Sequence, residues 1–432
     1  MQKTASYKEK FAKISGNTTL LTLSSEHQDF IEKLAFTLRF TQQELRQIVE
    51  IQRDLSMWGE DDLSAFFKLR KIDISDFTPD KKKEVLTFLF EHVNSLRHSA
   101  KTYPQDGLKR PKKREKSKIT QVESEKKIHG MCPVASPRTV CCNLRTIDAV
   151  ENCVFGCSYC TIQTFYSPQV TFDKGIKEKL RAIELDPEKK YHFGTGQSSD
   201  SLAWGDRFDN LQALCGWAAD NPNILLEFKT KSDNVQYFVE NEVPPNILCT
   251  WSLNPETIIQ NEEHFTASLK KRLSAARLVA DQGIKVGFHF HPMIYYAAWE
   301  IDYPAIVTNL LQSFDPEEIL FISMGSVTFI KPVIKKIRNL GLPSKILQMP
   351  LVPDPHGKYT YNDDIKVAMF RRQFAAFAQW HDKVFFYLCM EKDAIWQRTF
   401  GSAYATNAEF EEDMLQSCFR KIDKSTTDAK LI

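Results

Sequence analysis

The sequence predicts an α/β fold: a parallel sheet that curls into a barrel or a partial barrel, preceded by a small all-helical N-terminal domain. From Cys132 onward, short apolar segments typical of strands alternate with helical segments. Repeated β-α units imply a parallel sheet, and right-handed crossovers curl it. Residues 1–100 instead carry apolar side chains at helical spacing.

Length and composition set broad limits on the function. The 432 residues suffice for one large domain and an extra one, and 42% hydrophobic with 26% charged residues is ordinary for a globular protein. A net charge of +2 gives no global electrostatic argument for nucleic acid. No apolar run approaches the ~20 residues of a membrane helix, so we expect a cytoplasmic protein without a membrane partner. In that compartment the ten cysteines are expected as metal ligands or buried thiols rather than as disulfides.

Helix-start signals mark the N-terminal domain, residues 1–100. Thr41–Glu44 is a capping box, and Thr78-Pro79 supplies an N-cap and a proline at the first helical position. We expect the apolar stripes of these helices to form a core without chemistry. The stripe positions are Phe30, Leu34 and Leu38; Leu45, Ile48, Val49 and Leu55; and Val85, Phe88, Leu89, Val93 and Leu96.

Residues 101–130 are predicted to be a mobile basic linker. Lys109–Lys118 holds seven basic residues, one acid and no apolar periodicity. The segment is either a solvated connection or a phosphate-contacting arm. It lacks the interleaved aromatics of a platform on which single strands stack.

The predicted barrel occupies residues 131–391 and is followed by a C-terminal tail, 392–432. The clearest helix between strands is Thr266–Gln282, with Gly283 as its stop. The strand candidates are Val140–Asp148, Tyr191–Thr195, Ile224–Thr230, Ile247–Leu253, Ile284–His291, Ile319–Met324 and Val384–Met390.

The most informative stretch is a loop that places Cys153, Cys157 and Cys160 within eight residues. Three thiolates on one loop can hold an iron–sulfur cube by three irons and leave the fourth iron open. A zinc module needs a second close ligand pair to complete its knuckle, and none follows. A zinc site or a buried thiol cluster remains the alternative interpretation.

The CxxxCxxC spacing, with Tyr159 before the last cysteine, resembles the radical S-adenosylmethionine (SAM) superfamily. Further stretches in the same order narrow the resemblance to the spore photoproduct lyase family, over about residues 131–391. This resemblance implies a partial (β/α)6-type barrel with its chemistry at the C-terminal ends of the strands. The stretches are Gly196–Asp200, Lys229–Asn234, Trp251–Pro255 and Val286–Pro292, with Trp299 and Tyr303 behind the last.

The resemblance also implies the cofactors and the partners. A [4Fe-4S] cluster would be ligated by Cys153, Cys157 and Cys160, and SAM would chelate the open iron. Reductive cleavage of SAM would then produce a 5′-deoxyadenosyl radical. An electron donor such as flavodoxin or ferredoxin would supply the electron. DNA repair is the activity of the family.

Four further residues match cofactor-binding positions of the family. Tyr159 corresponds to the aromatic residue beside the adenine, and Ser199, Lys231 and Ser252 fall in SAM-binding segments at strand ends. A lysine there can pair with the methionyl carboxylate. Without the resemblance, Tyr159 would be core, Lys231 a solvated loop residue and the serines turn caps.

Two histidines lie on one predicted strand. His289 and His291 are two residues apart, so both face one side of the strand and are expected to point into the barrel. They could bind substrate or phosphate, relay protons, or serve a structural role. The family commonly has an acid at the position of His291.

The chain departs from the lyase at the residues of the repair reaction. Gln197 stands where the lyase has its hydrogen-donor cysteine, and Thr161 replaces the tyrosine after the last cluster cysteine. We therefore do not expect thymine-dimer reversal by the same route, and no catalytic residue is assigned. Cys141 and Cys142 match a Cys-Cys pair of lyase-like relatives, with an accessory metal role or burial as alternatives.

The leading hypothesis is a radical SAM enzyme acting on an unidentified substrate, with nucleic acid as the first substrate class to test. The alternative is a nucleic-acid-binding protein whose metal is structural, in which the basic linker and the helical domain matter most.

Overall fold

The computed structural model describes residues 7–72, 78–108, 118–132, 139–162, 169–354 and 357–429. The chain divides into two compact units, which are described separately. The helical unit comprises Met1–Pro111 with Lys331–Leu351, and the barrel unit comprises Lys112–Ile330 with Val352–Ile432. Most of the predicted basic run, residues 109–117, lies outside the described residues.

The helical unit begins with helices α1 to α5, and both predicted helix starts are confirmed. The Thr41 side chain accepts from the Glu44 amide and the Glu44 side chain accepts from the Thr41 amide, which closes the capping box of α3. Thr78 caps α5. One stripe position differs from the prediction, because Phe88 is 47% exposed. The bounds are α1 Tyr7–Ser15, η1 Leu20–Thr22, α2 Ser25–Leu38, α3 Gln42–Trp58, α4 Leu63–Leu69 and α5 Pro79–His98.

A segment far along the chain completes this unit. Helix α12 (Lys331–Leu340) buries Val333 and Ile337, and the Arg338 guanidinium donates two 2.8 Å hydrogen bonds to the carboxylate of Asp54 on α3. After the helix, the Ser344 amide donates to the carbonyl of Met57 at 2.8 Å. The short helix η5 (Ile346–Gln348) follows. This segment falls within residues 131–391, the range predicted to form the barrel.

The barrel unit is built on one eight-stranded sheet of order β16-β12-β11-β9-β8-β7-β3-β2. All neighbours are parallel except β2 and β3, so seven parallel strands follow chain order, as predicted. The bounds are β2 His129–Met131, β3 Arg145–Ile147, β7 Tyr191–Thr195, β8 Ile224–Thr230, β9 Ile247–Ser252, β11 Lys285–Met293, β12 Ile319–Ser326 and β16 Phe385–Leu388.

The sheet is strongly curled. The rings of His192 on β7 and Phe321 on β12 are 6.0 Å apart between centroids, although three strands separate β7 from β12 in the sheet. Neighbouring strands are about 4.8 Å apart, so a flat sheet would hold these rings nearly 20 Å apart. The predicted partial barrel is therefore confirmed.

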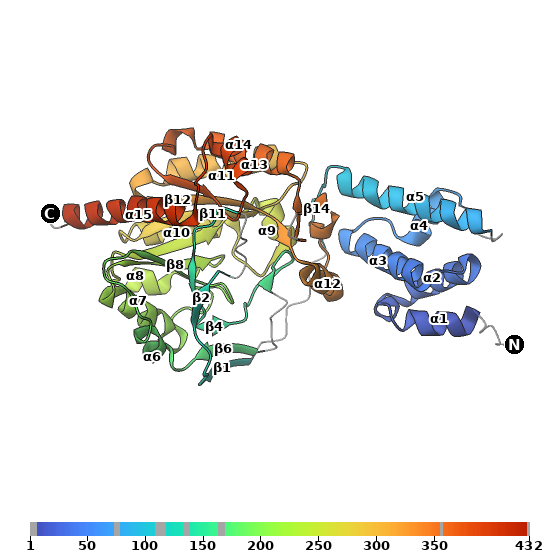
Figure 1. The fold of residues 1–432 in the computed structure, drawn as a ribbon, viewed down its shortest axis with the longest axis horizontal. Helices are drawn as coiled ribbons and strands as arrows, with labels where there is room; N and C mark the ends of the chain where they lie inside the picture. Colours follow the sequence, from blue (N-terminus) through green and yellow to red (C-terminus); the bar gives the residue numbers. More distant parts are fainter. Residues whose placement is uncertain are drawn as a thin grey trace. The chain divides into compact units, whose positions relative to one another are not determined.

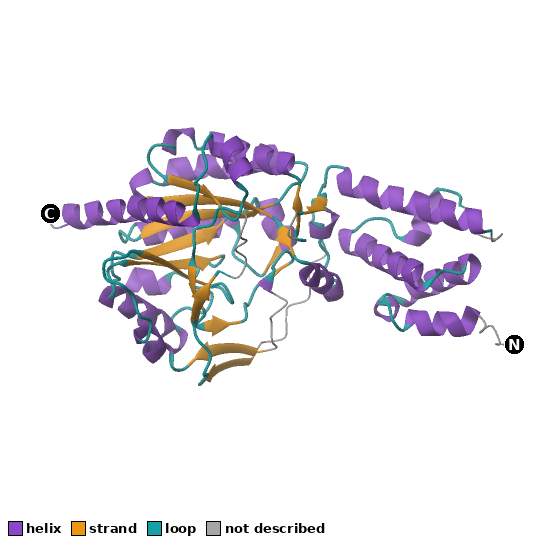
Figure 2. Ribbon diagram, in the orientation of Figure 1, coloured by secondary structure: helices purple, strands orange, loops and turns teal. Residues whose placement is uncertain are grey.

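Helices cover the outside of this sheet (Figures 1 and 2). The predicted helix 266–282 is α10 (Leu269–Ala280), capped by Ser268 and followed by Gly283 at φ +78°. The C-terminal tail forms the long helix α15 (Asn407–Ala429). The other helices are α6 Ile176–Arg181, η3 Arg207–Asp209, α7 Asn210–Asp220, α8 Gln236–Glu240, α9 Glu256–Glu262, α11 Trp299–Ser313, η4 Pro316–Glu318, α13 Asp363–Ala376, η6 Ala378–Trp380 and α14 Asp393–Phe400.

Two predictions about extended segments need correction. The first strand begins at Arg145 rather than at Val140, because Val140 instead forms an isolated bridge with Glu391. The range 101–130 is not wholly a linker, since it contains β1 and the start of β2; β1 pairs in parallel with β6. The minor strands are β1 Lys118–Val122, β4 Val150–Glu151, β5 Gly156–Cys157, β6 Gln169–Asp173, β10 Glu263–His264, β13 Thr328–Phe329, β14 Leu351–Pro353 and β15 Tyr359–Tyr361.

Within the described ranges, no helix has both the length and the apolar character needed to cross a bilayer.

The Asp54–Arg338 ion pair is expected to stabilise the packing of α12 against α3. Asp54→Asn replaces by a neutral amide a carboxylate whose side chain is 3% exposed and which also lies 3.6 Å from Arg97, so two arginines lose their anionic partner. Local stability should fall by about 3 kcal/mol. Hydrogen exchange followed by mass spectrometry should show faster exchange in α3 and α12. Glu50→Gln is the control, because Glu50 is 41% exposed and 3.6 Å from Arg338, and should cost under about 1 kcal/mol. Equal effects of both variants would contradict the prediction.

Candidate active site

The cysteine loop lies beyond the C-terminal end of β3 and is paired with a later segment. Strand β5, which contains Cys157, pairs antiparallel with β10, so that Cys157 lies opposite Glu263. The Ser158 amide donates to the Glu262 carbonyl at 2.8 Å, and the Ser158 hydroxyl donates to the Glu262 carboxylate. The Cys160 amide donates to the Cys157 carbonyl at 3.1 Å and closes the turn. The chain segment after β9 therefore fixes the shape of the cysteine loop.

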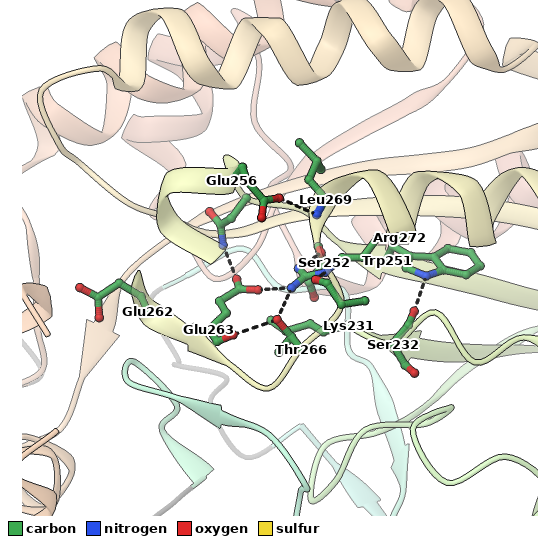
Figure 3. Close-up of polar contacts among 12 residues, drawn as sticks. Lys231, Ser232, Trp251, Ser252, Glu256, Glu262, Glu263, Thr266, Leu269 and Arg272 are labelled. Atoms are coloured by element: carbon green, nitrogen blue, oxygen red, sulfur yellow. Dashed lines mark hydrogen bonds and ion pairs between the residues drawn. The ribbon is translucent and has the colours of Figure 1, made fainter. Parts of the chain in front are cut away.

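Beneath this pairing lies a buried ion pair between Glu263 and Arg272 (Figure 3). Both side chains are fully buried. Arg272 also donates to the Ser252 carbonyl at 2.7 Å and to the Thr266 hydroxyl at 2.7 Å. Burial disfavours the Glu263 carboxylate, but Arg272, with Lys231 and the hydrogen bonds from Tyr159 and Asn254, outweighs burial and lowers the pKa of Glu263. The pair is therefore a permanent charge contact between α10, the end of β9 and the cysteine loop.

The same carboxylate accepts from Tyr159. The Tyr159 hydroxyl donates to Glu263 Oε1, and Asn254 Nδ2 donates to that oxygen at 2.8 Å. Burial and the Glu263 charge raise the pKa of Tyr159, so the phenol stays protonated. Asn254 in turn accepts from the Tyr303 hydroxyl at 2.7 Å, and Tyr303 accepts from the Ile294 amide at 2.6 Å. This chain of contacts joins Tyr159 to the end of β11.

Ser199 and Lys231 flank the loop from two neighbouring strand ends. The Ser199 hydroxyl donates to the carbonyl of Asn152 at 2.9 Å, directly before Cys153. The Lys231 amide donates to Asp200 Oδ2 at 2.7 Å, while the Lys231 ammonium lies 5.9 Å from the centre of the Tyr159 ring. The Lys231 backbone is thus fixed, and its ammonium points toward the aromatic ring of the loop.

The turn that presents Ser199 requires a glycine at position 196. Gly196 has φ +86°, and an added Cβ would lie 2.6 Å from Ser201 Oγ and 3.0 Å from the Lys229 carbonyl oxygen. Any other residue would be strained in conformation and in contact.

A polar network fills the barrel below the strand ends. The Glu227 carboxylate on β8 lies 3.0 Å from His192 Nε2 and 2.6 Å from His289 Nε2, and it accepts from the Thr250 hydroxyl at 2.6 Å. Burial and Lys229 lower the pKa of His289 to about 4. His289 therefore points inward as predicted, and its neutral ring is bound by neighbouring side chains.

His291 lies one layer higher on the same strand. An added Cβ on Gly325 would lie 2.7 Å from the His291 ring, so Gly325 provides the space for the imidazole. Burial, followed by the charges of Lys229, His289 and Lys231, lowers the pKa of His291 to about 3. The ring is therefore neutral at physiological pH.

All ten cysteines are thiols. Burial is the main cause that raises the pKa of Cys153 to about 12, and it also raises the pKa of Cys157. Cys141 is buried, and a hydrogen bond from Cys142 lowers its pKa to about 7. Near this pair, burial disfavours the charged Lys229, but Glu227, followed by Cys389, Cys142 and Cys132, raises the pKa of Lys229 overall.

The donor set of the cysteine loop fits an iron–sulfur cube better than a single ion. Cys153, Cys157 and Cys160 lie in one another's electrostatic field, beside the Lys231 charge. Yet in the described part of the chain, no three His, Cys, Asp or Glu side chains are arranged to hold a metal ion. A structural zinc ion almost always has four ligands. Three thiolates on one loop can instead each bind one iron of a cube and leave its fourth iron open.

The structure brings Tyr159, Lys231 and Ser252 together around the Glu263–Arg272 pair, and Ser199 to the base of the cysteine loop. Glu263, Arg272 and their buried neighbours are not predicted from the sequence, since charged residues normally lie at the surface. The clearest missed signal was the pair of adjacent acids Glu262-Glu263, which follows the family-like Trp251–Pro255 stretch after one short helix, α9. Other residues that carry the site without having been predicted are Asp200, Glu227, Lys229 and Asn254.

The buried pair predicts the stability of the loop. Arg272→Met leaves the Glu263 carboxylate without its cation in a dry interior, which should cost about 3 kcal/mol. The amides of residues 156–158 should then exchange roughly a hundred times faster in hydrogen-exchange mass spectrometry. The matched control is Arg277→Met on the same helix, which breaks partly exposed pairs with Glu318 and Asp281 and should cost under about 1 kcal/mol. Unchanged exchange in Arg272→Met would show that the pair does not hold the loop.

The sequence is similar to that of spore photoproduct lyases. The family model "Spore photoproduct lyase" matches residues 145–360. Spore photoproduct lyase of Clostridium acetobutylicum is 23% identical over 229 residues, which cover 50% of this chain and 68% of that protein. The Geobacillus sp. lyase is 24% identical over 233 residues, with the same two coverages.

Solved structures share the fold. Spore photoproduct lyase complexed with dinucleoside spore photoproduct matches with a TM-score of 0.54 and 20% identity, over 62% of this chain and 82% of that one. A double mutant of the lyase, with bound AdoMet and dinucleoside spore photoproduct, matches with a TM-score of 0.53 at 20% identity, over 62% and 82%. The family match spans half of the chain and includes the cysteine loop and every strand of the barrel from β3 to β12. The chain therefore belongs to the spore photoproduct lyase family of radical SAM enzymes.

Proposed function

We propose that the protein binds a [4Fe-4S] cluster through Cys153, Cys157 and Cys160 and cleaves SAM reductively. The observation that carries this proposal is the cysteine loop clamped at the C-terminal edge of the sheet by β10, with Tyr159 and the Lys231 ammonium beside it. SAM bound at such a cluster supplies a 5′-deoxyadenosyl radical when an electron arrives. The donor is proposed to be a small redox protein such as flavodoxin or ferredoxin.

The residues of this chain would bind and orient the cofactor. The Lys231 ammonium is the cation for the SAM carboxylate, because it faces the loop and makes no ion pair or hydrogen bond with the described residues. Tyr159, fixed by Glu263, supplies the face for the adenine. Ser252 and Ser199 would line the same edge. The buried pairs beneath exclude water from the reacting atoms.

The substrate class proposed first is nucleic acid. The relatives are named for a DNA lesion, and one solved relative is complexed with dinucleoside spore photoproduct. Gln197 is half-buried at the end of β7, and its amide N–H is too strong a bond to donate a hydrogen atom to a carbon radical. We therefore propose a reaction that ends differently from dimer reversal. An enzyme that depends on reduced thiols is proposed to act in the reducing cytoplasm.

Cluster binding provides the first test. Anaerobic reconstitution should yield a brown protein with ~4 irons per chain and broad visible absorption. Replacement of Cys153, Cys157 or Cys160 by Ala should each abolish that absorption, while Cys215→Ala, a buried thiol on α7, should retain it. After reduction, wild type should convert SAM to 5′-deoxyadenosine, measured by chromatography. A colourless protein with stoichiometric zinc would instead support a nucleic-acid-binding protein with a structural metal.

The position of Gln197 provides a second test. Anaerobic incubation with dinucleotide spore photoproduct, reductant and SAM should give little or no thymidylyl-thymidine with wild type. Gln197→Cys restores a weak S–H bond at this position and should raise the yield, while Gln197→Ser, which is similar in size to Cys but lacks the thiol, should not. Efficient repair by wild type would overturn this interpretation, since neither the thiol nor the tyrosine that Thr161 replaces would then be required.

A further inference from the structure

Two lysines at the end of β8, Lys229 and Lys231, carry ammonium groups that donate no hydrogen bond to any of the described residues. Lys231 lies beside Tyr159, and Lys229 lies one layer deeper, on the same face of the strand as Glu227. The Lys229 ammonium is 4.0 Å from Glu227 Oε1, which is beyond hydrogen-bond length. Among the described residues, neither ammonium donates a hydrogen bond, although each carries three donors.

Glu227 cannot satisfy Lys229 because other donors already occupy it. His192, His289 and Thr250 contact its two oxygens at 2.6–3.0 Å. The carboxylate therefore compensates the charge of Lys229 from a distance and leaves its N–H groups open. Burial disfavours the charged lysine, but Glu227, together with Cys389, Cys142 and Cys132, outweighs burial and raises the pKa of Lys229 above its usual value.

Apart from Glu227, histidine rings and thiols surround Lys229. His289 and His291 are uncharged rings, and burial raises the pKa of the nearby Cys142 and Cys389 thiols. The Lys229 side chain is nonetheless 28% exposed, so a ligand in the barrel can reach it. The three N–H groups of this partly exposed ammonium are therefore available to a ligand that brings an anionic acceptor.

The two lysines place two positive charges at this end of β8. SAM has a single carboxylate, and Lys231 is the lysine at the cysteine loop: its charge acts on Cys153, Cys157 and Glu263. Lys229 acts on Glu227 and on the Cys142 thiol. After burial, Lys229, His289 and Lys231 lower the pKa of His291, so this ring lies within reach of both lysine charges. We propose that Lys229 is an oxyanion subsite and that the substrate carries a phosphate or a carboxylate group there; this inference rests on the proposed function.

Residue-resolved lysine labelling tests the proposal. Reconstituted protein is labelled with acetic anhydride under anaerobic conditions and the modified peptides are measured by mass spectrometry. SAM alone should slow labelling of Lys231. With SAM present, inorganic phosphate, acetate or thymidylyl-thymidine should slow labelling of Lys229, and whichever does so identifies the anion class. Lys271, exposed and paired with Asp233 at 2.9 Å, is the internal control, and sodium chloride at equal ionic strength controls for screening.

Matched variants extend the test to affinity. Calorimetry with the protecting anion should show binding about tenfold weaker in Lys229→Met, with SAM affinity unchanged, and the reverse pattern in Lys231→Met. Lys229→Arg, which keeps the charge, should retain anion binding. Labelling of Lys229 that no anion slows, or SAM protection of both lysines, would overturn the proposal. Loss of SAM protection at Lys231 would count against the proposed function instead.

Discussion

The site depends on one buried ion pair, Glu263 with Arg272. Burying two charges is expensive, and the pair persists because the hydrogen bonds around it satisfy the remaining oxygens and N–H groups. Arg272 binds the end of β9 and the start of α10, while Glu263 binds Tyr159 and lies opposite Cys157. The ion pair thus turns a loop rich in cysteines, which has little secondary structure of its own, into a defined part of the barrel edge.

The curled parallel sheet explains why residues so distant in sequence share this edge. Strands that follow chain order all end on the same side, so the cysteine loop, Ser199, Lys231 and Ser252 arrive there from four successive strands. Side chains two residues earlier form the layer below, where Glu227 and His289 meet. Lys229 stands between the two layers, which gives the barrel a charged interior beneath an edge suited to a cofactor.

Much of this arrangement could be predicted from the sequence. Seven runs of β-branched and aromatic residues between turn signals predict the seven parallel strands. The cap residues Thr41 and Thr78 predict where α3 and α5 begin. The first strand was drawn too long because Val140 is apolar, although its partner is Glu391 rather than a neighbouring strand. The pairing of β1 with β6 could not be predicted, because hydrophobic periodicity and strand propensity do not identify a partner strand about fifty residues away. The burial of Glu263 and Arg272 could not be predicted either, because a charged residue in a sequence gives no sign that the fold removes it from water.

The helical unit is made of two separate stretches of the sequence. This affects how the chain can be shortened, and how it should be compared with related proteins that lack these helices. A chain shortened to begin after Pro111 would still contain α12, whose Val333 and Ile337 are buried in that unit and whose Arg338 would have lost Asp54. Such a truncation would uncover an apolar stripe and an unpaired arginine, a combination that favours aggregation. Removing the helices cleanly requires a second excision at Lys331–Leu351, so the helical unit is gained or lost by two coordinated changes rather than by a simple extension of the chain.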